Sequence, residues 1–273
     1  MFLPAAWEFL LLQDGKSVKL HPSAPSHCLG QGIISVMKKD IRDKFHRSNF
    51  DFIIRKIPFL SCLSEDELAD LRKDVVDKHF KKNQVILHEE DTLNYLYFVY
   101  SGKVKVIQLS AEGQERIVAI RKRGEFFGEM AILDGMTAPA TVVAMEETSV
   151  GFISARDFQS RLLQNRKVLM EIISMLCSRL REAWLMLKVL SFAGAEQRIR
   201  VVLKNVSDQF GVKDQRGIII NLRLRHKDIA ELAATARETV TRSLKCFIQS
   251  EEIEILENKY ILLKPAFFKK IDL

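Results

Sequence analysis

Four polar side chains near the end of the sequence have the types and the spacing needed to read a nucleic acid. They are Arg237, Glu238, Thr241 and Arg242. On a helix the positions i, i+1, i+4 and i+5 gather within about one turn. An arginine can donate two hydrogen bonds to guanine in the major groove, and a glutamate can accept one from cytosine. The alternative, from the charges alone, is a solvated helix face held by salt bridges.

The elements that must position these side chains form a helix-turn-helix pattern. Two helical segments, about 227–232 and 236–250, are joined by the three residues 233–235. Such a spacing is typical of the helix-turn-helix motif. Apolar residues fall on another face of the second segment and are predicted to pack inward: Val240, Leu244 and Phe247. A polar cluster at the start of the second helix therefore favours the major groove.

Short β-rich runs flank this motif. Residues 205–216 are predicted to be the end of a helix and a polar loop, and 217–222 a short strand. Beyond the motif, the runs 253–256 and 260–263 lie on either side of a turn at Asn258. This pattern predicts a hairpin, the wing of a winged helix-turn-helix.

Upstream, residues 76–153 are rich in strand-forming residues. The predicted strands include 84–87, 95–100, 103–109, 116–121 and 140–144. Glycine-containing turns separate them at Gly102, Gly113, Gly124 and Gly135, where glycine allows positive φ without steric cost. Strands at such regular spacing, with no helix between them, predict an antiparallel sandwich or barrel.

From residue 157 the hydrophobic period becomes helical and predicts a long, self-associating helix. Apolar residues recur at alternating spacings of four and three, as in a coiled-coil seam. They are Leu169, Ile173, Leu176, Leu180, Ala183, Leu187 and Leu190. The alternative is one amphipathic helix buried in its own domain. Gly194 then predicts a helix end and a hinge.

Composition sets the class of protein. With 273 residues, 47% of them hydrophobic, the chain can fold into two ordinary domains. Its net charge of +7 attracts polyanions without separating nucleic acid from a membrane surface. The four cysteines are far apart and the histidines do not cluster, so we predict no metal site. They are Cys28, Cys62, Cys177 and Cys246.

The start of the sequence carries little structural signal. The apolar stretch 1–12 contains Glu8 and is too short to span a bilayer. We therefore predict a cytoplasmic protein with reduced thiols and no membrane partner. Residues 1–48 have no clean periodicity and stay an unassigned N-terminal extension. Ser64 and Glu67 form a capping box that predicts the start of a short helix.

Two segments resemble motifs of a known family. Residues 236–242 (ARETVTR), preceded by 228–232 (DIAEL), are similar to the recognition segment of the cyclic-AMP receptor protein and fumarate-nitrate reduction regulator (CRP/FNR) family of bacterial transcription factors. Residues 124–135 (GEFFGEMAILDG) resemble the phosphate-binding cassette of that family. The resemblance covers about residues 51–265.

The resemblance implies an α+β fold in three parts. These are an antiparallel β-roll of the cyclic-nucleotide-binding jelly-roll type over 49–156, a helical linker and dimerisation helix over 157–192, and a winged helix-turn-helix over 193–273. It also implies a homodimer that binds double-stranded DNA and contacts RNA polymerase. Two-fold symmetry would then be mirrored in a palindromic operator with half-sites about one helical turn apart.

The resemblance also implies roles for individual side chains. In the cyclic-AMP branch, residues at these positions read a TGTGA-type half-site, so Arg237 and Arg242 would contact guanines and Glu238 a cytosine. Thr239 would contact a phosphate, and His226 is a weaker candidate for the backbone.

Two positions of the motif vary within the family. Thr241 stands where the oxygen-sensing branch has a serine, and it would support the recognition helix. Ala234 stands where most members have glycine in the turn. The sequence therefore does not predict the detailed geometry of this turn.

The effector site departs from the cyclic-AMP pattern. That pattern uses a glutamate for the ribose and an arginine–serine pair for the cyclic phosphate. Glu129 is present, but Ala138 and Pro139 stand at the arginine–serine positions. Because losing a buried charged pair weakens binding by about a thousandfold or more, we predict that cyclic AMP is not the effector. The other candidate pocket residues are Gly128, Met130, Ala140, Thr141 and Ser178.

Three other kinds of effector are compatible with the sequence. Haem is one, because some family members sense gases through it and His79 and His88 lie on β-rich runs. Thiol sensing by Cys177, beside the predicted seam, is another. A different small effector that suits an apolar pocket is the third. The clustered N-terminal cysteines of the iron–sulfur branch are absent from this sequence.

Two other classes of function are alternatives. A cyclic-nucleotide-binding-like module that regulates a kinase or channel would share the β-roll without binding DNA, and the helix-turn-helix disfavours it. An enzyme is disfavoured because the sequence has no glycine-rich nucleotide loop, nucleophile elbow or metal triad. We predict no catalytic residues. Whether DNA binding activates or represses depends on where the operator lies.

Overall fold

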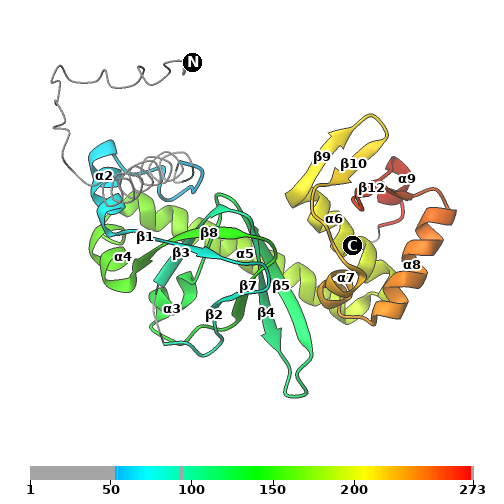
Figure 1. The fold of residues 1–273 in the computed structure, drawn as a ribbon, viewed down its shortest axis with the longest axis horizontal. Helices are drawn as coiled ribbons and strands as arrows, with labels where there is room; N and C mark the ends of the chain where they lie inside the picture. Colours follow the sequence, from blue (N-terminus) through cyan, green and yellow to red (C-terminus); the bar gives the residue numbers. More distant parts are fainter. Residues whose placement is uncertain (1–52, 54, 93–94, 272–273) are drawn as a thin grey trace, which may run out of the picture. The chain divides into compact units, whose positions relative to one another are not determined.

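The computed structural model describes residues 53, 55–92 and 95–271, which Figure 1 shows as a strand-rich region, a long helix and a smaller helical module. The predictions for residues 1–48, including Cys28, lie outside the described residues. The strand-rich region begins with helix α2 (Glu65–Asp74). Ser64 and Glu67 form the predicted capping box at its start.

The strand-rich region consists of two four-stranded antiparallel sheets. One has the order β1-β8-β3-β6 and the other β2-β7-β4-β5. The strands are β1 (Val76–Phe80), β2 (Val85–Leu87), β3 (Tyr95–Ser101), β4 (Lys103–Leu109), β5 (Glu115–Lys122), β6 (Phe126–Phe127), β7 (Thr141–Ala144) and β8 (Thr148–Ser154). A short helix, α3 (Glu129–Asp134), lies between β6 and β7, so the prediction that no helix separates the strands was wrong there. The predicted antiparallel β-roll is confirmed.

Strand β3 shows why this region has two hydrophobic layers. Successive side chains of a strand point to opposite faces of the sheet. Leu96, Phe98 and Tyr100 pack with the helices outside the sheet, whereas Tyr97 and Val99 face the interior between the sheets. Because both faces are covered, the strand is apolar throughout and does not alternate with polar residues.

The turns between strands depend on glycine at the predicted places. The four glycines named above all have positive φ. At Gly102, φ is 81° and an added Cβ would lie 2.5 Å from the carbonyl oxygen of Glu147. A larger residue there would therefore meet both backbone strain and a clash.

Two helices lead out of the β-roll. Helix α4 (Ala155–Arg161) is followed by the 27-residue helix α5 (Arg166–Phe192). Asn165 caps the start of α5, since its side chain accepts hydrogen bonds from the backbone of Lys167 and Val168. The helix ends just before Ala193, and Gly194 caps the next helix. The predicted break at this glycine is confirmed.

The C-terminal module consists of four helices and a four-stranded sheet. Its elements are α6 (Ala195–Phe210), β9 (Gly211–Asp214), β10 (Gly217–Ile220), α7 (His226–Ala233), α8 (Arg237–Gln249), β11 (Ile253–Ile255), β12 (Ile261–Leu263) and α9 (Pro265–Phe268). The sheet has the order β11-β12-β10-β9, and β11 pairs with β12 as the predicted wing. The loop predicted over 211–214 was wrong, because these residues form strand β9 against β10.

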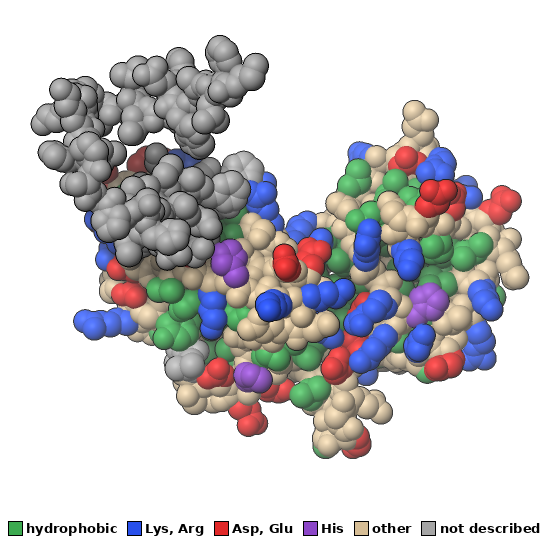
Figure 2. All heavy atoms as spheres, in the orientation of Figure 1, with side chains coloured by type: hydrophobic (Ala, Val, Ile, Leu, Met, Phe, Trp, Pro, Cys, Tyr) green, Lys and Arg blue, Asp and Glu red, His purple; other side chains and the backbone are tan. Residues whose placement is uncertain are grey.

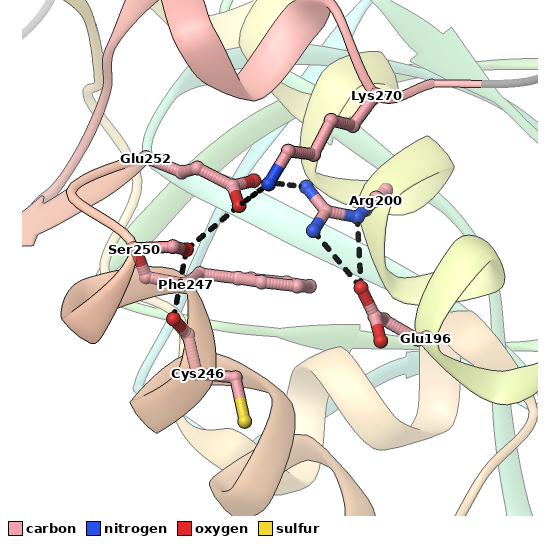
Figure 3. A network of polar contacts seen from close by, with 7 residues as sticks. All are labelled: Glu196, Arg200, Cys246, Phe247, Ser250, Glu252 and Lys270. Atoms are coloured by element: carbon pink, nitrogen blue, oxygen red, sulfur yellow. Dashed lines mark hydrogen bonds and ion pairs between the residues drawn. The ribbon is translucent and has the colours of Figure 1, made fainter.

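A buried charged cluster ties α6 to the wing (Figure 3). Arg200 on α6 is 4% exposed and forms an ion pair with Glu252, which is 1% exposed. The second carboxylate oxygen of Glu252 accepts hydrogen bonds from Ser250 and Lys270 at 2.7 and 2.8 Å. Burial alone would raise the pKa of Glu252, but these three donors outweigh it and hold the pKa at about 2. The carboxylate therefore stays charged inside the module.

The turn between α7 and α8 has a left-handed residue. Ala234 adopts φ 54° and ψ 49°, and its N–H donates to the carbonyl of Ala230. A left-handed conformation costs a residue with a Cβ about 1–2 kcal/mol, whereas glycine adopts it freely. The geometry of the turn is thus kept despite the missing glycine.

We expect Ala234→Gly to stabilise the protein. The relief of left-handed strain, less the extra entropy of glycine in the unfolded chain, should raise the free energy of unfolding by up to about 1 kcal/mol. Ala233→Gly is the matched control: Ala233 lies in helix α7 and is fully buried, so this change should destabilise by about 1 kcal/mol or more. Urea unfolding measures both, and equal effects would contradict the interpretation.

Candidate nucleic-acid interface and effector pocket

The start of α8 carries the side chains that the sequence predicted to read DNA bases. Arg237, Glu238 and Arg242 are all exposed. Within the described part of the chain, none of these three side chains forms a hydrogen bond or an ion pair. The alternative of a helix face held by salt bridges therefore does not describe these three residues. Three unpaired charged side chains at a helix start are free to bind an outside partner.

The opposite face of α8 holds the helix in the module. Val240, Leu244 and Phe247 are 0%, 3% and 1% exposed, which confirms their predicted inward packing. They share one hydrophobic cluster with residues of α6, α7 and the wing. Burying such side chains contributes about 1.5–3 kcal/mol each, so the orientation of α8 follows from this face.

A hydrogen-bonded pair joins the two helices of the motif. The Thr241 hydroxyl donates to the carbonyl of Arg237 at 3.0 Å. Its oxygen lies 2.9 Å from Nδ1 of His226 at the start of α7. His226 and Thr241 thus fix the angle between the helices, and Thr239 is half-buried beside them.

Basic side chains surround the motif. Arg223, Lys245 and Lys259 are exposed on the loop before α7, on α8 and in the wing turn. Figure 2 shows Lys and Arg side chains over the region of α7 and α8, with Asp and Glu side chains among them. Such a surface can attract a polyanion and contact its phosphates.

The predicted effector pocket is built at the end of β6. Gly128 adopts a left-handed conformation, with φ 85°, and caps α3. Glu129, the first residue of α3, is 7% exposed and forms an ion pair with Arg179 of α5. Arg179 also donates to the carbonyl of Phe126 at 3.2 Å and stacks 4.7 Å above its ring. No local sequence pattern predicts the contact of Arg179 with Glu129, because the two residues are 50 positions apart.

The positions that would hold a cyclic phosphate offer few donors. The N–H of Ala138 already donates to the carbonyl of Asp91 at 3.1 Å, and Pro139 has no N–H. The Thr141 hydroxyl oxygen accepts a hydrogen bond from the N–H of Glu89 at 3.0 Å. Ala138 and Ala140 are buried, whereas Pro139 is exposed.

The other predicted effector residues are exposed on the surface. Met130 and Ser178 are exposed on α3 and α5. The two haem candidates, His79 on β1 and His88 after β2, are also exposed and belong to different sheets. Within the described residues, no group of three potential metal ligands gathers, and no helix is long and apolar enough to cross a membrane.

Comparison with known proteins assigns both regions to families. Residues 77–165 match the cyclic nucleotide-binding domain, and residues 197–271 match the Crp-like helix-turn-helix domain. The cyclic AMP receptor protein of Thermus thermophilus is 32% identical over 192 residues, which cover 70% of this chain and 86% of that protein. The chain belongs to the CRP/FNR family of transcription regulators.

Other CRP/FNR relatives support the same fold. The global nitrogen regulator of a Nostoc species is 29% identical over 68% of this chain and 85% of its own. The structure of FixK2 from Bradyrhizobium japonicum is 20% identical, covers 73% of this chain and 98% of that one, and superposes with a TM-score of 0.65. The long helix and helix-turn-helix of this CRP/FNR protein thus stand in their expected order.

Proposed function

We propose that this CRP/FNR regulator binds, as a homodimer, a palindrome of TGTGA-like half-sites in double-stranded DNA. The observation that carries the proposal is the group of exposed, unpaired side chains Arg237, Glu238 and Arg242 at the start of α8. In the major groove, the two arginines would each donate to a guanine and Glu238 would accept from a cytosine. Thr239 and the surrounding basic residues would contact phosphates.

The proposal is tested by a gel shift at a stated salt concentration. The probe is a duplex with two TGTGA half-sites about one helical turn apart, and the control duplex has the same composition with both half-sites scrambled. A specific regulator should bind the palindrome about 10³-fold or more tightly than the control. Equal affinity for the two duplexes would refute sequence-specific recognition.

Dimer formation is proposed through an apolar stripe on α5. Exposed side chains follow one another at alternating spacings of three and four, as in a coiled coil. They are Met170, Ile173, Cys177, Leu180, Trp184 and Leu187. Ile173, Leu180 and Leu187 belong to the predicted seam, and Ala183 is exposed beside it. The other predicted seam residues, Leu169, Leu176 and Leu190, are half-buried.

We expect Leu180→Glu to separate the dimer into monomers. Leu180 is 50% exposed in one copy and would face its partner at the centre of the stripe, where two buried, unpaired carboxylates repel each other. Sedimentation should then report a monomer, and palindrome binding should fall with it. Leu180→Met keeps an apolar side chain and should stay dimeric. A Leu180→Glu variant that sediments as a dimer would contradict this use of α5.

The effector is proposed to differ from cyclic AMP. The Thermus thermophilus relative is named as a cyclic AMP receptor protein, but here Ala138 donates its N–H internally and Pro139 has none to donate. A cyclic phosphate would therefore lack both its charged partner and its backbone donors. Calorimetry of the purified protein against cyclic AMP, cyclic di-GMP and haem tests this proposal, and tight binding of cyclic AMP would refute it.

The rest of the proposed function follows the family. We place the protein in the cytoplasm, where it would act on transcription through contact with RNA polymerase and catalyse no reaction. The match of residues 197–271 to the Crp-like helix-turn-helix domain favours this function over that of a regulatory module without DNA binding.

A further inference from the structure

A cavity of about 360 Å³ lies where β5, α5 and α6 meet. Its volume is within the range that holds a small organic molecule. Much of its wall is apolar, including Ile120, Ala183, Met186 and Val206. It is separate from Ala138 and Pro139, and Leu232 of the helix-turn-helix lines one side. A ligand here would touch both the β-roll and the DNA-binding module.

Two arginines from different elements line this cavity. Arg121 comes from β5 and Arg179 from α5. Nε of Arg121 is buried without a hydrogen-bond partner. Among the described residues, no carboxylate lies within ion-pair distance of Arg121. Burial, followed by repulsion from Arg179, lowers the pKa of Arg121. Since arginine stays charged in proteins, Arg121 is a half-buried cation that forms no ion pair with any described residue.

Arg179 is held rigidly beside it. Its contacts with Glu129 and with the carbonyl and ring of Phe126 restrain the guanidinium. This arrangement keeps a second cation near Arg121. A planar guanidinium suits carboxylate and phosphate groups, because its donors match their paired oxygens.

The acidic residues of the rim leave Arg121 unneutralised. Asp208 lies on the rim but is paired with Lys204 at 2.7 Å. Glu182 is exposed and makes no ion pair with any described residue. A bound anion could therefore complement the half-buried positive charge of Arg121.

We propose that this cavity binds a small organic anion, whose carboxylate or phosphate group lies against the guanidinium of Arg121 beside Arg179. The carbon part of the anion would pack on Ile120, Ala183 and Met186. The inference deepens the proposed function, since it names the chemical class of effector for a regulator that lacks the cyclic-phosphate donors.

The test uses the full-length dimer with two probes, inorganic phosphate and succinate. Each is added at constant ionic strength against chloride, and the thermal unfolding midpoint and calorimetric affinity are measured. Wild-type protein should gain stability with at least one probe; a response to phosphate or to succinate identifies the group recognised. Arg121→Met should weaken that binding by about tenfold or more. In chloride it should unfold at the same or a higher temperature than wild type, because a half-buried cation without an ion-pair partner is gone.

Arg116→Met is the matched control, because Arg116 is an exposed residue of the same strand outside the cavity. It should keep the full anion response.

The inference is overturned if neither probe acts on the wild type, if Arg121→Met responds like the wild type, or if Arg121→Met unfolds at a clearly lower temperature in chloride. The last result would mean that a second copy already pairs with Arg121. The gel shift is independent: loss of palindrome recognition alone defeats the proposed function, and loss of the anion response alone defeats this inference.

Discussion

Arg237→Ala is expected to weaken binding of the TGTGA-type palindrome by about 30-fold to 10⁴-fold. One arginine that donates two hydrogen bonds to guanine contributes about 1–3 kcal/mol, and the dimer would lose one such contact in each half-site. Arg237 is exposed and has no partner among the described residues, so no internal contact is lost with it. The fold should stay unchanged, and a gel shift at fixed salt measures the effect.

The sharper readout is the change in specificity. Replacing the guanine read by Arg237 should weaken binding of the wild type by about 1–3 kcal/mol per half-site and leave the variant nearly unaffected. Lys245→Ala is the matched control on the same helix, since Lys245 is also exposed. It should weaken binding to all sequences alike and reduce the salt dependence. An Arg237→Ala protein that still discriminates this base pair would refute base reading by Arg237.

Arg200→Met is expected to lower the free energy of unfolding by about 3–5 kcal/mol. Removing one partner of a buried ion pair leaves the other charge uncompensated. Here Glu252 would keep only Ser250 and Lys270. The guanidinium also lies 4.0 Å above the ring of Phe247, on the inner face of α8. The loss should therefore loosen the recognition helix as well as the wing.

Urea unfolding followed by circular dichroism measures this loss. Lys204→Met is the control one turn along α6, because Lys204 pairs with Asp208 at 2.7 Å on the surface and such pairs contribute about 0–1 kcal/mol. The double variant Arg200→Met with Glu252→Leu should recover part of the stability, since an apolar pair can replace a buried ionic one. If Arg200→Met lowers the free energy of unfolding by no more than Lys204→Met does, the charged cluster in Figure 3 does not stabilise the module.

Local signals in the sequence were sufficient for most of the elements. The helix predicted over 236–250 is observed at Arg237–Gln249, and the strand predicted over 103–109 is observed at Lys103–Leu109. Glycine turns and the Ser64 capping box also stand where predicted. These features depend on neighbouring residues, such as side-chain periodicity, caps and backbone preference, and so they can be read along the chain.

The apolar positions of α5 show what local sequence patterns do not predict, namely which face of the helix packs on which neighbour. Leu176 belongs with the β-roll cluster, whereas Met170 and Trp184 are exposed on the stripe. Both faces of the helix are apolar, because one packs on its own domain and the other is left exposed. Spacing identifies an apolar helix but does not tell which face meets which neighbour.

The sequence by itself determined the family, the order of the elements and the polar residues at the start of α8, since these follow from local pattern and motif. Only the tertiary structure decided that Arg179 contacts Glu129, that Arg200 meets Glu252, and that Nε of Arg121 is buried without a hydrogen-bond partner. These contacts join residues about 50 positions apart or depend on a cavity formed by several elements. Their charges could equally have faced water, and burial by the packed chain is what gives them their chemistry.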